Sequence, residues 1–235
     1  VRVLAREIPD LEELSNRFAP ELDEIPAVAI LGMPALSNYA VQLEVGAGVM
    51  RLLSPAEGQR IIAGEGETRR SPATSPSELT RVVARMEAQG YGYWLAGTGP
   101  EDFRLRVRFA TVGHDTIIDA TAADLAGSAG GAIDELRVAG LNLARFVALR
   151  PEDLSSMPEP RPDVVLGNGL LAHFRVTVDL VGNQILFEQM REPRFPFEER
   201  EYFVARAEGA PARIEAFSKA HAASRLAGEA SEKLL

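Results

Sequence analysis

The strongest constraint on how this chain of 235 residues can fold is a pattern that occurs twice. In its clearer copy, an apolar run at 164–166 ends at Gly167 and a short apolar segment follows at 169–173. Alternating residues at 174–180 then lead through a turn to a second apolar run at 185–187. This order predicts a buried strand, a short helix and a hairpin of two strands.

A second copy of the pattern lies near the start of the chain. An apolar run ends at Gly32, and an alternating stretch at 40–45 turns at 46–48 into a returning apolar run at 49–53. The two copies are related by a constant offset of 135 residues, because 167 − 32 = 135. Solenoid repeats have periods of roughly 20–50 residues, so the longer offset predicts two duplicated lobes. The matched positions are Leu36 and Leu171, Tyr39 and Phe174, Val41 and Val176, Leu43 and Val178, Glu44 and Asp179, and Leu52 and Phe187.

Composition excludes several classes of function. The net charge of −9 disfavours a nucleic acid or an anionic membrane as the main partner, since binding to phosphates requires a basic patch. The chain has no cysteine, which rules out disulfides, thiolate zinc sites and a cysteine nucleophile. The histidines lack the spacing of metal ligands, so we expect neither a metal nor another cofactor.

The start of the chain and its composition bear on its cellular location. The first residue is Val1, inside a short apolar stretch that reads as a strand, so we expect the chain to be a piece of a longer precursor. No apolar run reaches the roughly 18 residues that a transmembrane helix needs. The absence of cysteine and the abundance of alanine and arginine fit a bacterial periplasmic or secreted protein, and a cytoplasmic location stays open.

Periodicity and turn residues predict the remaining elements. Residues 55–75 read as an exposed linker, and residues 77–90 as a helix with Leu79, Val82, Val83 and Met86 on one face. The other expected elements are an arginine-faced strand at 103–109, a short buried strand at 116–118, two strands around Gly140, and one or two helices in 211–235.

The candidate for chemistry is Asp119, which follows the buried strand and precedes Ala120, Thr121 and Ala122. A carboxylate on such a turn of small residues can meet a second carboxylate and share one proton with it, because two like charges about 3 Å apart cannot both ionise. The pair then activates a water molecule and protonates a leaving amide. The simpler interpretation is that Asp119 only caps a turn.

Taken together, residues 103–187 resemble a lobe of the retropepsin and pepsin-like aspartic peptidases, and residues 29–52 resemble the closing part of a preceding lobe. The resemblance implies a mainly β fold of closed-barrel lobes in tandem, with a few helices. It makes Asp119 the catalytic residue, Ala120, Thr121 and Ala122 its active-site loop, and an extended peptide or protein the substrate. It also makes two glycine-ended segments the supports of the active-site loops, namely Ile30, Leu31 and Gly32 in the first lobe and Val165, Leu166 and Gly167 in the second.

These expectations divide the chain into a truncated first lobe (1–54), a linker with a helix (55–90), a second lobe (91–190) and a helical tail (191–235). The family motif would read Asp-Thr-Gly-Ala, whereas Ala120 lacks the bracing hydroxyl and Thr121 replaces the glycine. The offset puts the partner acid before Val1, since 119 − 135 = −16, unless a homodimer supplies it.

Three functions therefore stay open. The first is an aspartic endopeptidase that hydrolyses peptide bonds through a carboxylate-activated water. The second is an inactive relative of such an enzyme that binds peptides or serves as a scaffold. The third is an unrelated β-barrel protein that binds a carbohydrate or another ligand, which the long repeat disfavours.

Overall fold

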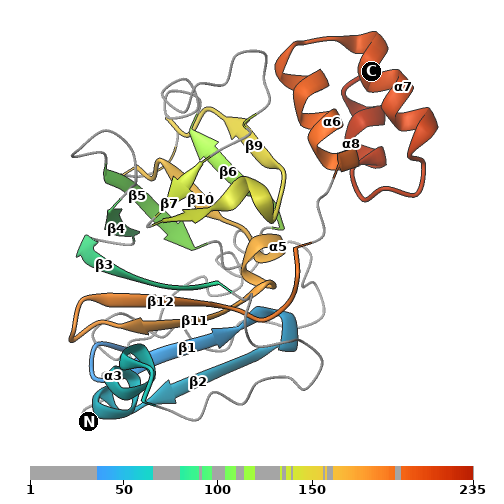
Figure 1. The fold of residues 1–235 in the computed structure, drawn as a ribbon. Helices are drawn as coiled ribbons and strands as arrows, with labels where there is room; N and C mark the ends of the chain where they lie inside the picture. The colour runs from blue at the N-terminus through green and yellow to red at the C-terminus, as the bar shows by residue number, and fades with distance from the viewer. Residues whose placement is uncertain are drawn as a thin grey trace, which may run out of the picture.

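The structure is a computed structural model in which helices and strands both contribute to the fold (Figure 1). It describes residues 36–65, 80–89, 92–96, 104–109, 114–119, 133, 136–138, 140–155, 157, 161–193 and 197–234.

Ten strands of the described residues form one sheet in the order β2-β1-β11-β12-β3-β4-β5-β10-β6-β9. A separate two-stranded sheet joins β7 (Arg137–Val138) and β8 (Leu141–Asn142), the two strands expected around Gly140. The ten strands are β1 (Ala40–Glu44), β2 (Val49–Leu53), β3 (Arg81–Gln89), β4 (Gly92–Ala96), β5 (Arg104–Phe109), β6 (Thr116–Asp119), β9 (Leu149–Glu152), β10 (Val164–Leu166), β11 (Phe174–Asp179) and β12 (Gln184–Gln189).

Both copies of the repeated pattern form the predicted hairpins. In the first, β1 and β2 are joined through the short 3-10 helix η1 (Val45–Ala47) and Gly48, whose φ of 63° favours glycine. In the second, β10 leads into the short helix α5 (Asn168–Leu171), and β11 and β12 follow as an antiparallel pair. Alternation of apolar and polar residues therefore predicted these strands correctly.

The two hairpins lie side by side because β1 pairs with β11 in antiparallel register, Val41 opposite Val178 and Leu43 opposite Val176. The offset of 135 makes Val41 equivalent to Val176 and Leu43 equivalent to Val178, so each residue faces the equivalent of the other. The centre of this arrangement is Gln42, whose Nε2 donates to Oγ1 of its own equivalent, Thr177, at 3.1 Å. The four strands β2-β1-β11-β12 thus have a local two-fold axis.

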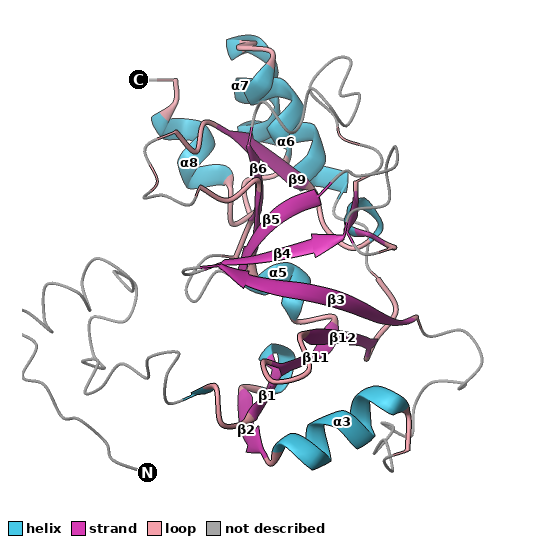
Figure 2. Cartoon of the chain, turned by 90° about the vertical axis from the view of Figure 1, so that its left-hand side faces the viewer, coloured by secondary structure: helices cyan, strands magenta, loops and turns pink. Residues whose placement is uncertain are grey.

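One face of this sheet borders the main hydrophobic core. Core side chains come from the second hairpin, from strands β3, β5, β6, β9 and β10, and from described residues between 133 and 147. Fully buried members include Val107, Ile118, Val164, Leu170, Val176 and Ile185. The four strands β2-β1-β11-β12 are called the lower sheet below. Its opposite face is covered by helix α3 (Pro55–Ala63), which packs on β1, β11 and β12 (Figure 2).

The prediction that residues 55–75 are a linker is wrong over residues 55–63, which form helix α3, and residues 66–75 lie outside the described ranges. Ser54 caps the N-terminus of the helix by accepting the backbone N–H of Glu57, Pro55 occupies the first turn, and Gly64 ends it with a φ of 84°. The helix lies close to β1, because a Cβ on Gly58 would come within 2.2 Å of the Cβ of Ala40.

Strand β3 corrects a second prediction, since a helix was expected at 77–90. β3 pairs with β12 on one side and β4 on the other, and Ala84 and Met86 are buried while Arg85 is exposed. Val82, Ala84 and Met86 also recur with the period of two that suits a strand, so the pattern fits both structures. The two neighbouring strands decide the conformation.

The C-terminal helices are α6 (Phe197–Ala207), α7 (Pro211–Ala220) and α8 (Ala227–Glu232), which confirms the helices expected after 211. They enclose a small core of their own, and α6 packs against β9. That core contains Tyr202, Phe203, Ala205, Ile214, Phe217, Leu226 and Ala230, with Ala148 added from the region before β9.

The prediction of a mainly β fold is therefore confirmed only in part. The described strands form sheets that do not close into a barrel, and helices make up much of the remainder. Within the part of the chain that the structure describes, no helix is both long enough and apolar enough to cross a bilayer.

Candidate functional site

The candidate site is built around β10, which lies between β5 and β6 in the upper part of the sheet (Figure 1). β10 runs parallel to β5, with Leu166 opposite Phe109, and antiparallel to β6, with Val164 opposite Ile118. The end of β10 therefore lies beside the end of β5 and the beginning of β6. This geometry decides which residues the following glycine can contact.

Gly167 lies against the residues that precede β6. A Cβ at this position would come within 2.2 Å of the backbone oxygen of Asp115 and 2.3 Å of that of His114, so only glycine fits. The N–H of Gly167 donates to the buried Oγ1 of Thr116 at 3.1 Å, and the N–H of Gly169 donates to the backbone oxygen of His114 at 2.9 Å. Close backbone approach, rather than an unusual φ, explains this glycine.

Asp119 lies at the opposite end of β6. It is four positions after Asp115, a distance of about 13 Å in a strand that rises about 3.3 Å per residue. Its backbone N–H donates to the oxygen of Asp163 at 2.8 Å, and its Oδ2 accepts the N–H of Leu154 at 3.2 Å. The half-buried carboxylate therefore holds the chain that follows β9, through a contact between residues 35 positions apart in the sequence.

The other predicted site residues are only partly described. Val165 and Leu166 are buried in β10, and Val165 pairs with Ile117 of β6. The structure brings Gly167 next to the start of β6 and not next to Asp119. Six of the predicted residues lie outside the described ranges: Ala120, Thr121, Ala122, Ile30, Leu31 and Gly32.

A network of charged side chains surrounds the start of β6, and sequence reasoning did not predict it. The carboxylate of Asp115 accepts a hydrogen bond from Nη1 of Arg150 at 2.9 Å and also forms an ion pair with Arg225. Burial alone would raise the pKa of Asp115, but hydrogen bonds from His114 and from the two arginines, with the charge of Arg225, hold that pKa well below its usual range. Asp115 is therefore a permanent anion at neutral pH.

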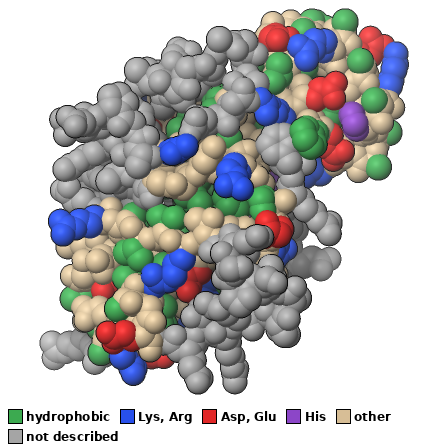
Figure 3. Space-filling model, viewed as in Figure 1, with side chains coloured by type: hydrophobic (Ala, Val, Ile, Leu, Met, Phe, Trp, Pro, Cys, Tyr) green, Lys and Arg blue, Asp and Glu red, His purple; other side chains and the backbone are tan. Residues whose placement is uncertain are grey.

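Arg150 connects this anion to the C-terminal helices. Its guanidinium makes a two-point contact with Glu229 of α8, at 3.0 and 2.9 Å, and donates from Nε to Glu152 at 2.7 Å. Arg206 of α6 contacts the same Glu152 at 3.0 Å. Charged side chains of both signs are visible over these helices in Figure 3. The partners are up to 79 residues apart in the chain, which is why local pattern could not reveal them.

One trio in the described part of the chain has the geometry of metal ligands. His114, Asp115 and Glu199 each offer a ligand atom, and these atoms lie within 4.8 Å of one another. However, the guanidinium of Arg225 donates to both Asp115 and Glu199. A cation supplied by the chain itself thus balances the two carboxylates.

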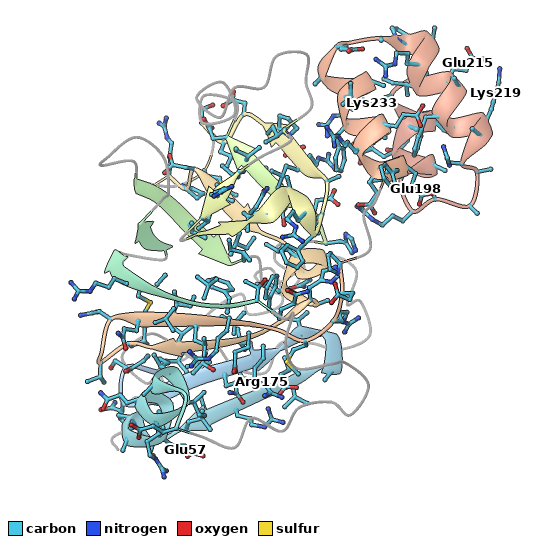
Figure 4. The ribbon with its side chains drawn as sticks, in the orientation of Figure 1. Glu57, Arg175, Glu198, Glu215, Lys219 and Lys233 are labelled. Atoms are coloured by element: carbon cyan, nitrogen blue, oxygen red, sulfur yellow. The ribbon has the colours of Figure 1, made fainter. Side chains whose placement is uncertain are left out.

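A second polar cluster lies on the α3 side of the lower sheet, around Arg175 of β11 (Figure 4). Arg175 is almost fully buried and donates from Nε to Glu44 of β1 at 2.9 Å. Glu44 also pairs with Arg51 of β2, and Arg51 donates to Gln42 at 3.1 Å. This cluster links the two hairpins across the local two-fold axis.

Comparison with known proteins adds no relative. No protein family, no curated protein and no solved structure matches this chain.

Proposed function

We propose that the chain is a catalytically inactive relative of the aspartic peptidases that binds an extended polypeptide or serves as a scaffold. The observation that carries the proposal is the position of Gly167. In the aspartic peptidases that this chain resembles, the segment equivalent to Val165, Leu166 and Gly167 supports the active-site loop. Here that segment lies against His114 and Asp115, at the far end of β6 from Asp119.

The residues at this end of the sheet lack what a dyad needs. Between the end of β5 and His114 the sequence reads Ala110, Thr111, Val112 and Gly113, with no carboxylate. The nearest acid is Asp115, and the two arginines keep it ionised. A catalytic dyad requires a carboxylate that holds a shared proton near the working pH, so a carboxylate paired with two guanidiniums is unsuited to the chemistry.

The fold-level part of the proposal is that the upper strands belong to a closed-barrel lobe and that the two hairpins are remnants of tandem lobes. The local two-fold axis at Gln42 and Thr177 supports the duplication. We place the protein in the periplasm or outside a bacterial cell, where binding of extended polypeptides by strand addition would operate on exposed chains.

The test has two arms. The purified chain is incubated with a mixed peptide library at acid and at neutral pH, beside the variants Asp119→Asn and Asp115→Asn, and cleavage and retention of peptides are both measured. We expect retention of extended peptides without hydrolysis. Hydrolysis that either substitution abolishes would establish an active enzyme, and failure to retain any peptide would refute the binding role.

A further inference from the structure

The two hairpins differ at their outer strands. β12 pairs with β11 on one side and with β3 on the other. Its repeat equivalent β2 pairs with β1 and, among the described residues, with no strand on its outer side. Figure 2 shows β2 at the end of the lower sheet. The local two-fold axis that relates β12 to β2 would put a counterpart of β3 beside β2.

The side chains of β2 are suited to a strand at the position that the axis gives to the counterpart of β3. Ile185 and Phe187 of β12 are 0% and 2% exposed, whereas their equivalents Met50 and Leu52, 135 residues earlier, are 49% and 47% exposed. Both pairs lie on the same face of the sheet, since a two-fold axis perpendicular to a sheet keeps its faces. Met50 and Leu52 are therefore apolar side chains at positions that the other hairpin buries.

The backbone groups of β2 alternate between its two sides in the same order as those of β12. On β12, the N–H of Gln189 donates to Thr80 and the oxygen of Asn183 accepts the N–H of Met86, each at 2.9 Å. The odd-numbered residues of β12 thus turn their backbone groups toward β3, because these groups alternate sides along a strand. The offset assigns the same role on β2 to Met50 and Leu52. An edge of this kind, with exposed apolar side chains and no strand partner in the part of the chain that the structure describes, is a template for strand addition.

We propose that the outer edge of β2 docks an extended strand from another polypeptide, running antiparallel and carrying alternating apolar side chains like those of β3. Within one chain β3 already pairs with β12 through residues 81–85 and with β4 through residues 86–89, so a second copy would supply β3 only by giving up these pairings. The inference deepens the proposed binding function and rests on it for its biological role. It assigns the place of binding to main-chain hydrogen bonds at β2 and to contacts with Met50 and Leu52.

The test uses a synthetic fluorescent peptide with the sequence of residues 80–89, since this segment contains β3, which pairs with the equivalent edge of β12. Fluorescence anisotropy should show saturable binding to the intact chain, and the double variant Met50→Lys, Leu52→Lys should bind at least tenfold more weakly. Lysines oppose strand addition at an edge. The control is Val181→Lys, which adds one positive charge, against two in the double variant, at another exposed apolar side chain in the turn between β11 and β12, and should change affinity by less than twofold.

Hydrogen exchange supplies a second readout that does not depend on the variants. The peptide should slow exchange at the amides of Met50 and Leu52. Equal binding of a scrambled peptide, equal binding by a double variant with an unchanged circular dichroism spectrum, or self-association that the double variant abolishes would each overturn the inference. Library peptides that bind equally well to the double variant would refute the β2 site alone, whereas hydrolysis dependent on Asp119 would refute the proposed function alone.

Discussion

The hairpins β1–β2 and β11–β12 have the same sequence pattern, the same antiparallel pairing and a shared axis, yet among the described residues only the second has a strand on its outer side. Ile185 and Phe187 belong to the main core, while Met50 and Leu52 are among the exposed large apolar side chains. The first hairpin is followed at once by α3, and the second by the segment that leads to α6. Two hairpins with the same sequence pattern can therefore contribute unequally to the free energy of folding, because the burial of a strand depends on which neighbouring segment covers it.

The largest expected difference is in core packing. Phe187→Ala should lower the free energy of unfolding by about 3–5 kcal/mol, because it leaves a cavity where a fully buried ring was. Leu52→Ala, at the equivalent position, should cost less than about 1 kcal/mol because its side chain is half exposed. Urea denaturation followed by far-ultraviolet circular dichroism measures both. Similar costs for the two variants would mean that β2 is covered in solution.

The charged cluster between the hairpins should show the next effect. Arg175→Met leaves Glu44 and the buried Glu188 without their shared neighbour, and we expect a loss of about 3 kcal/mol. Arg51→Met on the first hairpin removes a half-exposed partner of Glu44 and should cost less than about 1 kcal/mol. The same denaturation experiment compares them, and an equal loss would contradict the difference in burial.

The local axis offers a smaller test. Gln42→Ala, Thr177→Val and the double variant form a mutant cycle across the side-chain hydrogen bond that joins these two equivalent residues. A buried hydrogen bond between uncharged side chains predicts a coupling energy of about 1 kcal/mol. A coupling energy indistinguishable from zero would show that this contact does not hold the hairpins together. The pair Gln42→Ala with Ser218→Ala, whose residues lie in separate parts of the fold, should be additive.

The smallest effect concerns pH, where Glu44 and Glu188 should act with opposite signs. Burial raises the pKa of Glu44, but hydrogen bonds from Arg51 and Arg175 outweigh it, so that the pKa is lowered. Stability from Glu44 is then present above the unfolded pKa of about 4.3 and is lost as pH falls through the folded pKa. Burial raises the pKa of Glu188, so its contribution is largest at low pH and is lost as pH rises through its folded pKa.

Unfolding measured between pH 3 and pH 7 tests these signs. Glu44→Gln should be less stable than the unmodified chain at pH 7, and this deficit should shrink as the solution is acidified. Glu188→Gln should gain stability relative to the unmodified chain as pH rises. Parallel pH profiles for the two variants would show that the two carboxylates share one environment.

The sequence predicted the structure correctly where a local pattern is compatible with only one type of secondary structure. Alternation with glycine-bearing turns predicted both hairpins, because only a strand places every second residue on one face. Residues 80–89 carried a pattern that fits a helix or a strand, and pairing with β12 and β4 decided it. Helix α3 was missed although Ser54 and Glu57 have the spacing of a capping box, a signal that could have revealed it.

The candidate site divides in the same way. The importance of Gly167 could be predicted because its pattern is local and repeated. Its contacts could not, since they depend on β10 lying between β5 and β6, strands that begin some 50 to 60 residues earlier. The pairing of Arg150 with Asp115 and Glu229 likewise joins segments that no periodicity connects.

The sequence by itself determined the repeat, its offset, the two hairpins and the position of Gly167 at the end of a buried apolar run, because all of these follow from the spacing of residues along one segment. Only the tertiary structure decided that the glycine faces Asp115 rather than Asp119, that β12 is covered while β2 has no strand on its outer side among the described residues, and that Arg225 lies between two carboxylates. The physical reason is that burial, close approach and charge pairing are set by distances between segments far apart in the chain, and the order of residues does not encode those distances locally.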